Sequence, residues 1–146
     1  MTSRFLQTLL DDASRPFRSG GHFAYHYSRG TLSSDCIFRE LLKRGIFPAK
    51  ANFLDLGCGQ GSLFAWLLAA HHLHQQGNWP SDWAPAPMPL SLRGFELMQK
   101  DVDRAAHAFG ADHPVVKIRQ GDMCKVDFGQ ADVVTILDAL HYIDHL

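Results

Sequence analysis

The sequence predicts an α/β fold with a Rossmann-like, doubly wound, mostly parallel sheet, helices on both faces and further helices at the N-terminus. Three observations lead to this prediction. An apolar run at 53–56 passes into three alternating glycines and then into an apolar helical pattern. Two more strand-like runs, at 90–96 and 131–137, follow further along the chain. Strands that alternate with helices favour a parallel sheet, because each crossover returns the chain to the same end of the sheet.

Two helices are expected to precede the sheet. Phe5, Leu6, Leu9 and Leu10 recur at helical spacing, and Ser34-Asp35 can cap a second helix that ends at Gly45. Between them, the segment 16–32 is rich in glycine, serine and aromatic residues. It is expected to be a loop or a loosely helical lid. Its aromatic side chains could close a pocket or fasten the N-terminal helices to the core.

The glycines lead into an apolar helix at 63–70, which is the expected crossover to the second strand. The segment 75–91 that follows contains four of the seven prolines and two tryptophans, Trp79 and Trp83. Proline disrupts helix interiors and central strands. We therefore predict an inserted, Pro/Trp-rich surface loop over 75–91.

Regular alternation resumes with a second strand that ends at Glu96, and a helix over 98–109 ends at Gly110. Val115, Val116 and Ile118 predict a third strand, and 131–137 predicts a fourth. Leu146 follows shortly after the fourth strand. We expect that the C-terminal strands are missing, that 1–146 is a single and incomplete domain, and that the exposed sheet edge allows self-association.

The spacing of Gly57, Gly59 and Gly61 distinguishes between classes of nucleotide site. A dinucleotide fingerprint would need its third glycine at Ser62, and a phosphate loop would need a Lys-Ser or Lys-Thr pair that is absent here. The segment Phe53-Leu54-Asp55-Leu56-Gly57-Cys58-Gly59-Gln60-Gly61 instead resembles the first motif of class I S-adenosylmethionine-dependent methyltransferases.

This resemblance covers about 52–146 and implies that 1–50 is an N-terminal helical lid region and 51–146 the cofactor-binding half. It implies S-adenosyl-L-methionine as the cofactor. The positions that match cofactor-binding positions of the family are Asp55, Leu56, Gly57, Cys58, Gly59, Gly61, Glu96, Leu97, Gly121, Asp122, Met123, Leu137 and Asp138.

Individual roles follow from the resemblance. Glu96 would accept hydrogen bonds from the ribose hydroxyls, and Asp122 would accept one from the adenine amine while Met123 packs on the ring. The alternatives are a solvated surface acid at Glu96, a turn-capping carboxylate at Asp122, and an Asp55 that only braces amides of the glycine turn.

The segment after the fourth strand resembles the part of the family that faces the methyl group and the acceptor. Its ionisable candidates for catalysis are Asp138 and His141, and His141 could act as a general base near neutral pH. The alternative is that His141 is a packing or surface residue, as a histidine in the first turn of a helix often is. Small-molecule members of the family often use no fixed base. We expect no metal, because His71, His72, His74 and His107 do not form a ligand set by spacing.

The resulting hypothesis is methyl transfer from S-adenosylmethionine to a small-molecule acceptor by direct displacement. The alternatives are a truncated, non-catalytic cofactor-binding or interaction module and, less favoured, an NAD-dependent oxidoreductase. With 14 basic and 15 acidic residues, the net charge of −1 argues against a nucleic-acid partner. Without a long apolar run or a leader, and with three cysteines that we expect to be reduced, we predict a cytoplasmic protein that does not insert into a membrane.

Overall fold

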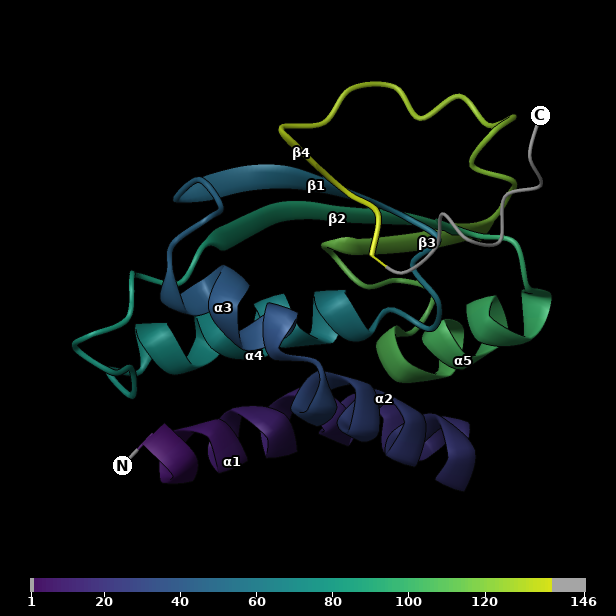
Figure 1. Cartoon of the computed structure of the whole chain (residues 1–146). Coiled ribbons are helices and arrows are strands. Elements are labelled where there is room, and N and C mark those ends of the chain that lie inside the picture. The colour runs from purple at the N-terminus through teal and green to yellow at the C-terminus, as the bar shows by residue number, and fades with distance from the viewer. Residues whose placement is uncertain (1, 138–146) are drawn as a thin grey trace.

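A four-stranded parallel sheet forms one layer of the molecule, whose residues 2–137 are described by a computed structural model (Figure 1). Its strands are β1 (Lys50–Leu56), β2 (Met88–Glu96), β3 (Val116–Gln120) and β4 (Val133–Thr135). All pairs are parallel and the order is β3-β2-β1-β4. The predicted parallel sheet is confirmed. The chain adds β2 and β3 on one side of β1 and then returns to add β4 on the other side. The fourth strand is shorter than the predicted run 131–137.

The helices of the described residues lie on one face of the sheet (Figure 1). They are α1 (Thr2–Ser14), the 3-10 helix η1 (Arg15–Gly20), α2 (His22–Ser34), α3 (Cys36–Lys43), α4 (Ser62–Gln75) and α5 (Gln99–Phe109). The steps from β1 to β2 and from β2 to β3 run in the same direction, so right-handed crossovers place α4 and α5 on the same side. The step from β3 back to β4 crosses the other face through 121–132 without a helix (Figure 1). Within residues 2–137, the expected helices on both faces are therefore found on one.

The segment 16–32 is helical, so the expectation of a loop is wrong and its helical alternative is correct. It forms η1 and α2, which are separated at Gly21, a residue with φ of +102°. Ala24, Ser28 and Leu32 recur every four residues and bury one face of α2. Phe17 packs edge-to-face against Phe109 of α5, which makes it a structural aromatic.

The predicted cap of the next helix is confirmed. The Asp35 carboxylate accepts a hydrogen bond from the backbone N–H of Ile37 at 3.0 Å at the start of α3.

Helix α4 is the centre of the core. Its side chains are buried nearly all round, which is typical of a helix with partners on both sides. One side packs on the sheet and the other on α1 and α2. Trp66 of α4 donates from Nε1 to the carbonyl oxygen of Phe38 at 2.9 Å, which also ties α3 to this layer.

The predicted surface loop at 75–91 differs from the structure in two ways. The connection covers only 76–87, because α4 ends at Gln75 and β2 begins at Met88. Its tryptophans face inward: Trp83 is buried and Trp79 half-buried, and each ring meets the Phe5 ring of α1 edge-to-face at 5.2 Å. They belong to the core and do not form a partner surface.

Pro89 lies within β2, although proline was expected to exclude a central strand from this segment. Met88 donates its N–H to Ala49 on the β1 side, so the next residue directs its backbone nitrogen to the β3 side. Pairing with β3 begins only at Leu92. At Pro89 the strand is therefore an edge on that side, where a missing N–H has no cost.

Candidate functional site

The carboxyl ends of the strands bring the predicted site segments together. The change of direction between β1 and β4 creates the kind of crevice in which open α/β sheets bind ligands. The turn 57–61 follows β1, Glu96 ends β2, Gly121 follows β3 and Leu137 lies just beyond β4. Adjacent parallel strands thus bring residues that are far apart in the sequence together at the carboxyl end of the sheet.

The glycine turn needs its glycines for different reasons. Gly57, Gly59 and Gly61 have φ of 73°, 57° and 92°, a region that side chains with a Cβ rarely adopt. A Cβ at Gly61 would also lie 2.7 Å from Cε2 of Phe109, so this glycine allows close helix packing. A Cβ at Gly59 would meet no heavy atom of the described residues within 4 Å. The turn is therefore open at Gly59, where a ligand can approach the backbone.

Glu96 holds this turn in place. Its Oε1 accepts the backbone N–H of Gly59 at 3.0 Å, and its Oε2 accepts that of Met98 at 2.8 Å. Its own carbonyl oxygen accepts the N–H of Gly121 at 3.0 Å. Each carboxylate oxygen carries a further lone pair, so acceptor capacity remains for a ligand. Glu96 joins the ends of β1, β2 and β3, and it is half-buried, unlike a solvated surface acid.

Asp55 lies buried at the end of β1 and bridges to β4. Its Oδ1 accepts the hydroxyl proton of Thr135 at 2.8 Å. Burial raises the pKa of Asp55 to about 7, the Thr135 hydrogen bond opposes this rise, and the nearby negative charge of Glu96 adds to it. Within the described residues, the carboxylate accepts no N–H of the glycine turn, so its bracing role is toward β4.

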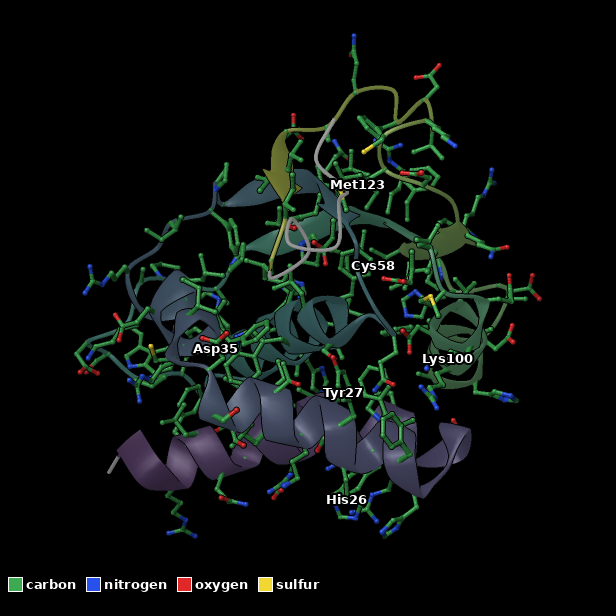
Figure 2. The ribbon with its side chains drawn as sticks, turned by 45° about the vertical axis from the view of Figure 1, so that its right-hand side comes forward. His26, Tyr27, Asp35, Cys58, Lys100 and Met123 are labelled. Atoms are coloured by element: carbon green, nitrogen blue, oxygen red, sulfur yellow. The ribbon has the colours of Figure 1, made fainter. Side chains whose placement is uncertain are left out.

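Cys58 is one of the buried side chains of the turn, and Figure 2 labels it. A Cβ at Gly94 of β2 would lie 2.6 Å from its Sγ, so the two residues fit closely. Burial raises the pKa of the Cys58 thiol well above its usual value, and the charges of Asp55 and Glu96 raise it further. The thiol is therefore a neutral packing group.

Asp122 caps its own turn in the structure. Its Oδ1 accepts the N–H of Cys124 at 2.9 Å, as the capping alternative describes. The other carboxylate oxygen accepts no hydrogen bond from the residues that the structure describes. Gly121 is needed here because a Cβ would lie 2.6 Å from Cγ1 of Val126. Met123 is half-buried on the segment that follows β3 (Figure 2).

The remaining predicted positions differ in their surroundings. Leu56 is buried, Leu97 is 58% exposed beside Glu96, and Leu137 is half-buried against the core. Asp138 and His141, the two predicted catalytic candidates, lie outside the described residues.

Sequence reasoning missed two polar residues that hold the site. Thr135 reaches Asp55 across 80 positions, and Gln60 of the glycine turn donates to the carbonyl oxygen of Ala24 across 36. The strand position of Thr135 gave a weak signal, because neighbouring parallel strands end together. Nothing in the sequence signals the contact of Gln60, because its partner is a backbone carbonyl, which every residue has.

Two kinds of site are absent from residues 2–137. In this range, histidine, cysteine and acidic side chains nowhere gather in threes as a metal ion would need. Over the same range, the helices are too short or too polar to cross a membrane.

Comparison with known proteins supports the architecture. No protein-family model and no curated protein sequence matches the chain. Among solved structures, it is similar to an S-adenosylmethionine-dependent methyltransferase from Mesorhizobium loti, with a TM-score of 0.54 and 23% identity over 77% of this chain. A magnesium protoporphyrin IX methyltransferase from Synechocystis, solved with bound SAH, matches over 88% of this chain and 53% of its own, with a TM-score of 0.47 and 23% identity. The chain spans 44% of the Mesorhizobium protein. It therefore has the fold of part of a Rossmann-like, class I S-adenosylmethionine-dependent methyltransferase.

Proposed function

We propose that the carboxyl end of this sheet binds S-adenosylmethionine, and that the domain to which the chain belongs transfers a methyl group to a small-molecule acceptor. One observation carries the proposal: the glycine turn and Glu96 meet at the ends of adjacent strands, with Gly59 donating to Glu96 Oε1 at 3.0 Å. The similarity of fold supports it.

The residues present fit this cofactor. An adenosyl group offers ribose hydroxyls and an amine as donors, and the site offers spare acceptor positions on Glu96 and Asp122. The open turn at Gly59 lets a ligand approach the backbone.

The charge of the site distinguishes a site for S-adenosylmethionine from a site for NAD. The thirteen matched positions include the acids Asp55, Glu96, Asp122 and Asp138 and no basic side chain. The carboxylates of Glu96 and Asp122 would repel the pyrophosphate of NAD, whereas they would attract a sulfonium and an ammonium group. The site therefore favours S-adenosylmethionine over NAD.

When bound, the cofactor supplies an electrophilic methyl group for direct displacement by the acceptor. Glu96 would hold the ribose and, through Gly59, set the shape of the turn. Asp122 and Met123 would hold the adenine, and Leu56, Cys58 and Leu137 would exclude water from the crevice. Asp138 and His141 stay predicted as the groups on the acceptor side.

Calorimetric titration with S-adenosylhomocysteine, and separately with NADH, tests the proposal. We expect S-adenosylhomocysteine to bind and Glu96→Ala to weaken it about tenfold or more, because hydrogen bonds to a charged group contribute about 1.5–3 kcal/mol. Glu40→Ala is the matched control, since Glu40 of α3 pairs with Arg44, the residue after the helix, at 2.8 Å, away from the carboxyl ends of the strands.

Three outcomes contradict the proposal. Tighter binding of NADH would favour the oxidoreductase. If Glu96→Ala and Glu40→Ala changed the affinity for S-adenosylhomocysteine equally, Glu96 would not be a ligand-binding residue. Absence of binding by a folded, monodisperse chain would favour the non-catalytic module.

A further inference from the structure

A buried polar cluster joins helix α2 to the glycine turn. Gln60, in the turn, is 1% exposed and donates from Nε2 to the carbonyl oxygen of Ala24 at 2.7 Å and to Oγ of Ser28 at 2.5 Å. Ser28 Oγ shares a hydrogen bond of 2.7 Å with Oγ of Ser62, the first residue of α4. We call these four residues, Ala24, Ser28, Gln60 and Ser62, the α2 latch.

The orientation of the Gln60 amide is set by its partners. The Ala24 carbonyl only accepts, so the amide must direct its NH₂ group toward α2. The Oε1 atom is then buried and accepts no hydrogen bond from the described residues. An unpaired buried acceptor is unfavourable, and an apolar side chain would avoid it. The glutamine is therefore costly as packing, which favours a role in fixing the geometry of this contact.

The latch lies directly against the proposed cofactor site. Gln60 stands between Gly59, whose N–H is held by Glu96, and Gly61, which packs on Phe109. A movement of α2 that displaced Gln60 would displace these two glycines. Conversely, a turn with a different shape could not present Gln60 to Ala24 and Ser28.

The position of α2 also fixes two exposed aromatic side chains. Phe23 and Tyr27 are 59% and 51% exposed and stack with a centroid distance of 5.8 Å. They immediately precede the latch residues Ala24 and Ser28 in the helix. Figure 2 shows Tyr27 on α2, with Cys58 of the turn above it in the view, beside the sheet.

We infer that Gln60 is a positioning residue that couples the docking of α2 to the conformation of the glycine turn, so that cofactor binding and α2 docking stabilise each other. This inference rests on the proposed function for the identity of the ligand. Coupling of this kind is reciprocal: whatever docked α2 adds to ligand affinity, the ligand adds to the stability of docked α2.

Hydrogen exchange with and without S-adenosylhomocysteine measures the effect of the ligand on α2, and the affinities of the variants measure the effect of α2 docking on the ligand. In the wild-type chain, we expect the ligand to slow amide exchange in α2 as well as in 57–61. Gln60→Met keeps the length of the side chain and removes its donors. It should weaken S-adenosylhomocysteine about tenfold, within the usual 5–150-fold range of coupling, and abolish the slowing in α2.

Ser33→Ala is the matched control on the same helix. Its hydroxyl donates to the carbonyl oxygen of Gly30 at an exposed position. It should leave the affinity and the slowing in α2 unchanged. A folded Gln60→Met chain with wild-type affinity and wild-type slowing would overturn the inference. If Gln60→Met does not fold, Ser28→Ala, which removes one hydroxyl from the latch, decides by the same two readouts.

Failure of the proposed function gives a different result. If the wild-type chain binds no S-adenosylhomocysteine, the proposed cofactor is wrong, and the coupling is read in the ligand-free protein. Gln60→Met should then speed exchange in 22–34 and 57–61 together. Faster exchange in only one of these segments would contradict the coupling.

Discussion

Asp55 makes the stability of the protein depend on pH. Its pKa is about 7 in the folded protein and 3.8 in an exposed reference state. Between these values the folded protein binds more protons than the unfolded one, so the free energy of unfolding falls as the pH rises. The unfavourable effect of Asp55 is absent below about pH 4 and complete above about pH 7.

Asp55→Asn should remove this dependence. The amide oxygen can still accept the hydroxyl proton of Thr135, and the side chain no longer ionises. From pH 5 to pH 8, we expect the variant to gain a few kcal/mol of stability relative to the wild type, since one pKa unit corresponds to about 1.4 kcal/mol. Urea unfolding across this range measures the difference. Wild-type and variant curves that stay parallel in pH would show that Asp55 does not titrate there.

At the level of single residues, the sequence predicts what is local. The glycine turn, Glu96 and Gly121 each follow directly from a strand end, so their places at one edge of the sheet could be inferred from topology. The link from Gln60 to Ala24 and that from Thr135 to Asp55 depend on which elements pack together. The local sequence pattern does not show which elements pack together.

The connection between α4 and β2 shows the same limit at the level of elements. Its prolines predict irregular backbone over 75–91, and the structure has irregular backbone over 76–87. Composition alone, however, gives no direction to Trp79 and Trp83, whose rings pack on Phe5 of α1. Helix α2 was likewise difficult to predict from its glycine, Gly30, and its aromatic residues, because its stability comes from the buried face that includes Ala24 and Ser28.

Trp83 is expected to be a stabilising core residue. Trp83→Ala should lower the free energy of unfolding by about 3–5 kcal/mol, the usual cost of truncating a buried tryptophan. Asp82→Ala, at the exposed neighbouring position, should change it by less than about 0.5 kcal/mol. Urea unfolding of both variants tests this difference. Similar small effects would mean that the connection is a surface loop after all.

At the level of the whole molecule, strand alternation was sufficient to predict a parallel sheet. The face on which each helix lies depends on the direction of each crossover, which the pattern does not contain. The sheet also has an unusual edge. Within residues 2–137, β4 pairs only with β1, and Val134 is 55% exposed. A groove formed by β4, Ile46, Phe47 and their neighbours runs beside it.

Self-association through this edge stays a prediction. Unpaired edge strands with apolar side chains tend to pair with other chains, and charged residues prevent it. We expect sedimentation velocity to show dimers or larger species that increase with concentration, and Val134→Lys to shift the population toward monomer. Ile37→Lys, at an exposed position on α3, makes the same charge change and should leave the distribution unaltered. A wild-type chain that stays monomeric at every concentration would exclude this use of the edge.

The enclosed position of α4 has a consequence for folding during synthesis. Helices α1 and α2 pack against α4, and α1 also packs against Trp83. While the ribosome is still making residues 1–50, the apolar surfaces of these helices that pack on α4 are not yet covered. They must wait until 62–83 has been made, and contacts between such distant segments slow folding. We therefore expect the nascent N-terminal segment to bind chaperones until α4 has emerged.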